Sequence, residues 1–120
     1  MQATKIVRFD AAHFLPSHTK CGRMHGHTYT VEVTVTGPLN DRGMVIDFHT
    51  LGKIIQEEII DKCDHQVLNE VLPIIPTAEN LAVYFVQRLR ERIESPHFVS
   101  SVRVWETPDS YATWGFYHGE

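Results

Sequence analysis

Apolar and polar positions alternate along two early stretches of the chain. Between Lys5 and His13 one side carries Val7, Phe9 and Ala11, and the other side carries polar residues such as Arg8 and Asp10. From His25 to Thr36 the alternation is more regular, with two histidines, a tyrosine and three valines opposed to threonines, a glycine and a glutamate. A period of two predicts half-buried strands over 4–14 and 25–36. The stretch 15–23, with its Pro, Lys and Gly, predicts a loop.

The pattern then changes to a helical one. After a GPLNDRG turn and a short extended MVID segment, apolar residues recur at Phe48, Leu51, Ile54, Ile55 and Ile59, with Asp47 placed to cap a helix. The segment KCDHQVLNEVLPIIP predicts a loop. A second helix is expected from about Thr77 to Glu94, with an apolar stripe of Leu81, Phe85, Leu89 and Ile93. Two strands, about 99–107 and 111–118, follow around a PDS turn.

This order of elements, ββααββ, predicts an α+β fold with two helices on one face of an antiparallel sheet. One domain over residues 1–120 is expected from the length. A four-stranded sheet leaves two open edges, which pairing between subunits could cover.

Composition narrows the class of protein. Hydrophobic residues are 42% of the chain and charged residues 22%, which is typical of a globular protein. No apolar run approaches the roughly 20 residues of a membrane span. The start, MQATKIVRFD, lacks the apolar stretch of a secretory signal, so a cytoplasmic protein with two free thiols, Cys21 and Cys63, is expected. The net charge of −4 argues against a nucleic-acid partner.

Histidine is enriched, with 8 residues against 11 lysines and arginines. His25 and His27 are two apart on a strand and therefore share a face, and His13 lies on the apolar side of the preceding strand. If the two strands form a hairpin, the three imidazoles converge. Three neutral imidazoles and an open position are a ligand set of catalytic zinc.

Cys21 leaves two interpretations open. It could be the fourth ligand of a closed structural zinc site. Its thiol could instead lie beside the metal as a base, because a nearby cation lowers a thiol pKa. Cys63, at a helix end, is most simply a packing residue.

Two further features carry possible chemistry. Asp64 and His65 form a carboxylate–imidazole pair, a common acid–base device, although adjacent loop residues are also often a simple turn. Glu106 shares the side of Val102 and Val104, so a carboxylate ends an apolar strand face. It could bind the N–H groups of a heterocycle in a bidentate way, or pair with Arg103. Glu79 fits either a pocket or the first turn of a helix.

With these residues in place, the sequence resembles the pyruvoyltetrahydropterin and carboxytetrahydropterin synthase family. The resemblance covers nearly the whole chain through FDAAHFLP, CGRMHGHTYTVEVTVTG, GMVIDFHTLG, CDHQVLNE, PTAENLAVY, VRVWETP and the final GE. It implies a tunnelling fold, in which ββααββ subunits close their sheets into a barrel, and a homohexamer of two stacked trimers. The sites of such an assembly lie at subunit interfaces.

Carried over by position, the resemblance implies that His13, His25 and His27 hold zinc and that Cys21 is the catalytic thiol. Asp64 and His65 would form the acid–base pair. Glu106 would anchor the pterin ring, with Thr77 and Glu79 lining the pocket. Ala78 departs from the Ser or Thr of many relatives. Lys20, Arg23 and His18, on the loop of Cys21, are hypothesised to meet the triphosphate.

The CxxxHGH spacing resembles the carboxytetrahydropterin synthases of 7-deazaguanine (queuosine-type) biosynthesis. The expected reaction converts 7,8-dihydroneopterin triphosphate to 6-carboxy-5,6,7,8-tetrahydropterin, acetaldehyde and triphosphate. Three alternatives remain. One is the pyruvoyl synthase reaction, which keeps the C–C bond. Another is a cupin-like oxygenase, because HGHTYTVE approximates an HxHx₄E ligand run. The last is a zinc-stabilised binding protein without turnover.

Overall fold

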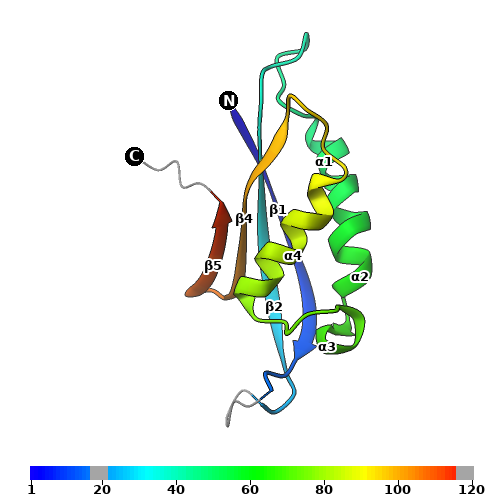
Figure 1. Cartoon of the computed structure of the whole chain (residues 1–120), viewed down its shortest axis with the longest axis vertical. Coiled ribbons are helices and arrows are strands. Elements are labelled where there is room, and N and C mark those ends of the chain that lie inside the picture. Colours follow the sequence, from blue (N-terminus) through cyan, green and yellow to red (C-terminus); the bar gives the residue numbers. More distant parts are fainter. Residues whose placement is uncertain (17–21, 116–120) are drawn as a thin grey trace.

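The structure is a computed structural model that describes residues 1–16 and 22–115 of the chain. It confirms the α+β class. Five strands form one sheet in the order β3-β1-β2-β4-β5, and the helices all lie against the same face of it (Figure 1). The opposite face of the sheet has no helix on it among the described residues.

The first two strands form the predicted hairpin. β1 (Gln2–His13) and β2 (His25–Thr36) pair antiparallel along their whole length, from Gln2 opposite Thr36 to His13 opposite His25. Tyr29 and the three valines of β2 are fully buried under the helices, while the threonines lie on the other face. Burying each valine contributes about 1.5–3 kcal/mol, which fixes the register because a slip by one residue would expose them all.

The last two strands extend this sheet. β4 (Phe98–Thr107) pairs antiparallel with β2, and β5 (Ser110–Gly115) pairs antiparallel with β4. Val99, Val102 and Val104 join the core. The predicted end of the last strand, residues 116–118, lies outside the described residues.

The first predicted helix begins where the pattern placed it. Asp47 caps α1 (Phe48–Ile55), with its carboxylate accepting from the amides of His49 and Thr50. The helix continues through a π-helical turn, η1 (Gln56–Ile60), into α2 (Asp61–Cys63). Leu51, Ile54, Ile55 and Ile59 are buried as predicted, but Phe48 is 54% exposed and does not belong to the core stripe.

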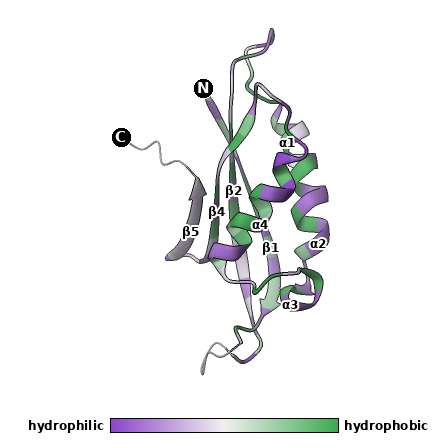
Figure 2. Cartoon of the chain, viewed as in Figure 1, coloured by the Kyte–Doolittle hydropathy of each residue, from purple (hydrophilic) through white to green (hydrophobic). Residues whose placement is uncertain are grey.

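The second predicted helix is shorter than the pattern suggested. α4 (Ala78–Arg90) has Thr77 as its N-cap, whose hydroxyl accepts from the amide of Asn80. Leu81, Phe85 and Leu89 face the core. The chain leaves the helix at Glu91, four residues before Ser95-Pro96, and the turn that follows packs Ile93 against the core from outside the helix. Figure 2 shows apolar colour on the sides of the helices that meet the sheet.

Two of the predicted irregular segments need correction. The segment 62–76 contains the end of α2, a two-residue strand β3 (Gln66–Val67) and a short helix α3 (Leu68–Val71). β3 runs parallel to β1 at Ala11 and Ala12, so the sheet is not purely antiparallel. MVID is not extended structure but a bend that buries Val45.

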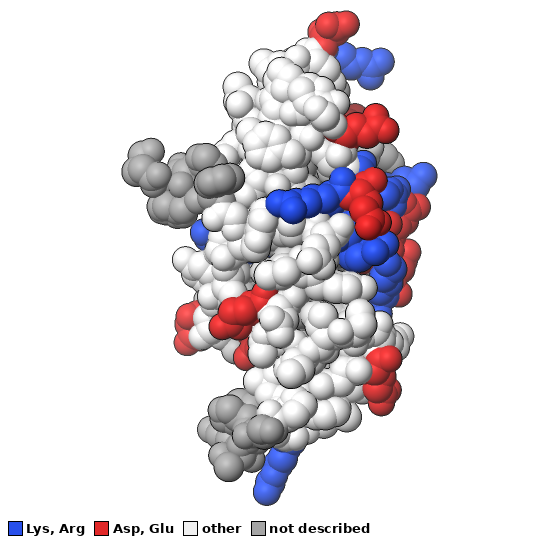
Figure 3. Space-filling model, in the orientation of Figure 1, with Lys and Arg blue, Asp and Glu red and all other residues white. Residues whose placement is uncertain are grey.

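Charged side chains gather on the helical side of the molecule, with both signs interleaved (Figure 3). Glu58 is the centre of this network and contacts Lys62, Arg88 and Arg92. The hydrogen bond from Arg92 lowers the pKa of Glu58 below its usual value. This network joins η1 and α2 to the end of α4. No helix in the described part of the chain is long and apolar enough to cross a membrane.

Candidate metal and acid–base site

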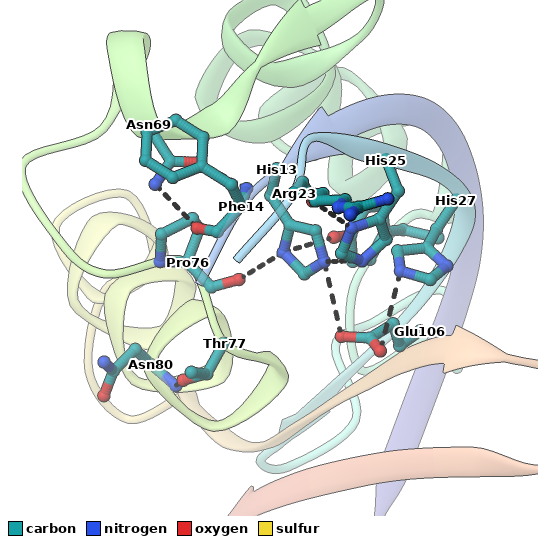
Figure 4. Close-up of polar contacts among 11 residues, drawn as sticks. His13, Phe14, Arg23, His25, His27, Asn69, Pro76, Thr77, Asn80 and Glu106 are labelled. Atoms are coloured by element: carbon teal, nitrogen blue, oxygen red, sulfur yellow. Dashed lines mark hydrogen bonds and ion pairs between the residues drawn. The ribbon is translucent and has the colours of Figure 1, made fainter. Parts of the chain in front are cut away.

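Three histidines converge at the end of the β1–β2 hairpin, as the pattern predicted. His13 and His25 are directly opposite each other in the register, and His27 projects from the same face two residues along β2. Their ring centroids lie 4.7 to 5.0 Å apart. Figure 4 shows the rings turned toward one another, with the carboxylate of Glu106 beside them.

Backbone carbonyls fix the orientation of two of the rings. The Nδ1 atom of His13 lies 2.8 Å from the carbonyl of Pro76, and the Nδ1 of His25 lies 2.7 Å from the carbonyl of Arg23. A carbonyl only accepts, so each Nδ1 carries a hydrogen, and in the neutral ring the Nε2 is then the nitrogen with the free lone pair. The two Nε2 atoms are 3.1 Å apart. Two lone pairs held at this distance fit a cation that both of them bind.

His27 completes the group. Its Nε2 is buried and has no hydrogen-bond partner among the described residues. Burial lowers the pKa of His27, an effect that the neighbouring Glu106 opposes and the other two histidines reinforce. The ring is therefore neutral near pH 7, the state that binds a metal. His13, His25 and His27 could together hold a metal ion.

Tyr29 and Asn69 support the first ligand, and the pattern gave no functional signal for either. The Tyr29 hydroxyl lies 3.1 Å from His13 Nδ1, and the residue is completely buried. Asn69 bonds both the N–H and the carbonyl of Phe14, which follows His13. Tyr29 stood on the apolar side of β2 and looked like a core residue. Asn69 lies in a segment without a periodic pattern.

Glu106 faces the histidines, as its place in the strand predicted. Its two carboxylate oxygens lie 3.6 Å from His27 Nε2 and 3.9 Å from His13 Nε2. The alternative ion pair with Arg103 is not formed, because that guanidinium donates to Thr113 and stacks over the Tyr111 ring. A carboxylate of this kind beside three imidazoles can accept from N–H groups of a bound heterocycle.

Glu32, the carboxylate of the cupin-like alternative, points to the other face of the sheet. It accepts a hydrogen bond of 2.5 Å from the indole N–H of Trp105. Its direction is thus opposite to that of His25 and His27, as strand geometry requires. The HxHx₄E interpretation does not describe this site.

Asp64 and His65 form the expected pair at a different place. His65 Nδ1 lies 2.9 Å from Asp64 Oδ2. The hydrogen bond with Asp64 raises the pKa of His65, and the hydrogen bond from the Asp10 amide, followed by that from His65, lowers the pKa of Asp64. None of the described contacts of this pair reaches the three histidines. The pair lies at the sheet edge next to Asp10. The side chains of Asp10 and His13 point to opposite faces of β1.

The remaining predicted residues are distributed as follows. Thr77 and Glu79 lie at the start of α4, directly after the Pro76 carbonyl that holds His13, and the Thr77 hydroxyl is used as a cap. Arg23 contributes its carbonyl to His25 and has an exposed side chain.

Cys21, Lys20 and His18 lie outside the described residues. Cys63 is buried, as predicted, and burial raises its pKa to about 12.

Comparison with known proteins identifies the family of this chain. The family described as 6-pyruvoyl tetrahydropterin synthase matches residues 2–115. A chain from Archaeoglobus fulgidus, provisionally named 6-carboxy-5,6,7,8-tetrahydropterin synthase, is 42% identical over 87% of this chain and 86% of its own length. The 6-carboxy-5,6,7,8-tetrahydropterin synthase of Haemophilus influenzae is 35% identical over 90% of this chain and 94% of its own.

Other relatives carry different names. A dihydroneopterin monophosphate aldolase from Pyrococcus furiosus is 33% identical over 88% of this chain and 91% of its own length. Among solved structures, 6-pyruvoyl tetrahydropterin synthase from Caenorhabditis elegans superposes with a TM-score of 0.86 at 27% identity, covering 98% of this chain and 96% of that one.

Proposed function

The chain belongs to the 6-pyruvoyl tetrahydropterin synthase family, and from this premise we propose that it is a zinc-dependent 6-carboxy-5,6,7,8-tetrahydropterin synthase of queuosine-type biosynthesis. The proposed substrate is 7,8-dihydroneopterin triphosphate, and the products are 6-carboxytetrahydropterin, acetaldehyde and triphosphate. The observation that carries the proposal is the convergence of three imidazoles, two of them oriented by backbone carbonyls, beside Glu106. The three-residue gap between Cys21 and His25 favours the carboxy over the pyruvoyl reaction.

The histidines suit zinc among the common metals. Three imidazole nitrogens at the end of a hairpin, two of them in rings oriented by a hydrogen bond from the other ring nitrogen, are typical of catalytic zinc sites. We propose His13, His25 and His27 as the ligands. When bound, zinc would supply a Lewis acid for the side-chain hydroxyls of the substrate.

The residues of the chain then have separate tasks. Glu106 holds the pterin through its N–H and NH₂ groups, with Thr77 and Glu79 at the edge of the same pocket. Cys21, as thiolate, removes a proton from the substrate side chain, and the Asp64–His65 pair donates or removes protons on its other side. Triphosphate leaves by elimination. Cleavage of the C–C bond then consumes one water, whose oxygen becomes part of the carboxylate while the two-carbon fragment leaves as acetaldehyde.

A second copy of the chain is part of the proposal. Asp64 and His65 lie beside Asp10 at the sheet edge, and none of their described contacts reaches the three histidines, so we propose that the pair serves the metal of another subunit. A homo-oligomer, in the family arrangement of two stacked trimers, would bring the pair of one subunit to the histidines of another. The sheet edges available for such pairing are β5 on one side and, on the other, β3 with the part of β1 that β3 does not cover.

We place the triphosphate near the loop that carries Cys21. Lys20 and Arg23 would supply positive charge there and His18 an N–H donor, and the Arg23 carbonyl lies 2.7 Å from His25 Nδ1, next to the proposed metal ligands. Their side chains would neutralise the phosphate oxygens of the leaving group.

A Cys21→Ala variant tests whether the site is catalytic or structural. If Cys21 is the thiol base, the variant keeps one zinc per chain and its melting temperature but loses triphosphate release. If zinc content and melting temperature fall together, Cys21 is a fourth ligand and the chain is a zinc-stabilised binding protein. Zinc content by mass spectrometry of the metal, measured beside turnover on the same sample, separates the two results.

A further inference from the structure

Asp10 meets the Asp64–His65 pair through three separate groups. Its amide N–H donates to Asp64 Oδ1 at 3.0 Å, and its carbonyl accepts from the His65 amide at 2.6 Å. Its carboxylate lies in the same cluster, in which an oxygen of Asp10, an oxygen of Asp64 and a ring nitrogen of His65 all lie within 4.8 Å of one another. One residue of β1 therefore touches both members of the pair.

The backbone of His65 is held in an unfavourable conformation by these contacts. Its φ of 59° places it in the left-handed region, and it is the one non-glycine residue of the described ranges with a positive φ. Such a conformation costs on the order of 1 kcal/mol and persists where neighbouring bonds determine it. The amide of His65 donates to the Asp10 carbonyl, and the next residue, Gln66, pairs with Ala11 as the first residue of β3. The result is an imidazole that is 77% exposed at the sheet edge.

The Asp10 side chain is itself fixed. Thr28, opposite Asp10 in the β1–β2 register, donates its hydroxyl to Asp10 Oδ1 at 2.6 Å. The carboxylate is thus held in place, and its charge faces the pair. Arg8 lies on the same face of β1, two residues away, but forms no ion pair with Asp10 among the described contacts. Among the described residues, Asp64 and Asp10 are the charged groups that act on the His65 ring.

We propose that Asp10 is a positioning residue for the acid–base pair: its backbone sets the strained geometry of His65, and its carboxylate is a second negative charge that favours the imidazolium. This inference rests on the proposed acid–base function of Asp64 and His65 and extends it to a third residue, which lies on β1. None of the described polar contacts of Asp10 reaches His13, His25 or His27. Its effect passes through His65, and the smaller raising effect of Asp10 on the pKa of His65, after that of Asp64, agrees with it.

The direction of the effect does not depend on which way His65 moves a proton. Replacing Asp10 by Asn removes a negative charge but keeps the backbone bonds. The imidazolium becomes less favoured, so the limb of the kcat/KM profile that reports His65 shifts to lower pH. This holds for an acid, whose activity falls above the pKa, and for a base, whose activity rises above it. Turnover at the optimum should fall by less than the roughly 10²–10⁴-fold that removal of an acid–base group costs.

The test is an NMR titration of the His65 ring in the full-length zinc-loaded protein, assigned with His65→Gln, beside kcat/KM against pH. Asp10→Asn should move both the titration and the limb to lower pH. Asp41→Asn, which removes a carboxylate from the loop between β2 and α1, should move neither. If Asp10→Asn folds poorly, Asp10→Ser removes the same charge from this exposed position.

An unchanged His65 titration in the Asp10 variants overturns the inference. The ring titration is independent of turnover, so it also separates this inference from the function proposed above. A shifted titration in a protein without activity on the pterin triphosphate would contradict the function and leave the role of Asp10 standing. Normal activity with an unshifted titration would support the proposed function and contradict the role of Asp10.

Discussion

The Nε2 atoms of His13 and His25 lie 3.1 Å apart, and the opposite nitrogen of each ring is bonded to a backbone carbonyl. The carbonyls come from different parts of the chain, Pro76 before α4 and Arg23 in the β1–β2 connection. The two lone pairs are therefore held facing each other by the fold itself. A bound cation would relieve their repulsion, and this relation is the structural basis of the proposed metal site.

Loss of one of these imidazoles should abolish tight metal binding. His25→Ala is expected to weaken zinc affinity by more than the roughly 10–100-fold that follows from removing a residue that only supports a ligand. Competition with a chromophoric chelator measures the change. His49→Ala, which alters an exposed histidine in the first turn of α1, is the matched control and should bind zinc as the unaltered chain does. Equal affinities for the two variants would contradict the assignment.

The Tyr29 hydroxyl should matter for metal binding although it lies away from the metal. Tyr29→Phe keeps the stacked contact with the Phe9 ring, whose centroid is 5.1 Å away, and removes only the group beside His13 Nδ1. We expect a loss of about 1 kcal/mol in the free energy of unfolding and a zinc affinity roughly 10-fold weaker. Denaturant unfolding and chelator competition measure the two effects. A variant with unchanged zinc affinity would show that the Pro76 carbonyl alone orients His13.

The two thiols should react very differently with an alkylating reagent. Burial raises the pKa of Cys63 to about 12, so at pH 8 its thiolate fraction in the folded protein is on the order of 10⁻⁴. Its reactivity should rise tenfold per pH unit as long as the protein stays folded. Cys21, as the proposed base, should be alkylated near neutral pH. Peptide mass spectrometry after iodoacetamide treatment measures the alkylation of each cysteine. A Cys21 that is alkylated no faster than Cys63 near neutral pH would contradict its proposed role as a base.

Arg23 and Glu106 should affect different ends of the substrate. Arg23→Glu is expected to raise KM strongly for the triphosphate substrate, with little change in the affinity for 7,8-dihydroneopterin, which has no phosphates. Glu106→Gln should weaken both, because it removes the acceptor for the pterin N–H groups, at a cost of about 1.5–3 kcal/mol. Calorimetric titration with the two ligands measures this. An unchanged KM in Arg23→Glu would remove that residue from the triphosphate site.

The sequence pattern predicted what depends on strand periodicity. Alternation placed His13, His25 and His27 on one buried face, and the hairpin register then brought them together. The same rule predicted the direction of Glu106, because it shares the side of Val102 and Val104. These residues are spaced along long, regular strands, where each position has one possible face.

Contacts that depend on irregular chain segments were not predictable in this way. β3 has two residues and cannot show a period, so its pairing with β1 and the position of Asp64 and His65 beside Asp10 had no signal. The Pro76 carbonyl is a backbone group that any residue would supply. Phe48 matched the helical stripe but lies exposed at the first position of α1, before the helix turns toward the sheet.

The proposed reaction is tested most directly by product analysis, using mass spectrometry, after incubation of the zinc-loaded protein with 7,8-dihydroneopterin triphosphate without a reductase. We expect 6-carboxytetrahydropterin, acetaldehyde and triphosphate in equal amounts, and no product from a Cys21→Ala control. A pyruvoyl product, with the C–C bond intact, would keep the site but contradict the proposed reaction. Absence of any product from a folded protein with zinc bound would contradict the proposed catalysis itself.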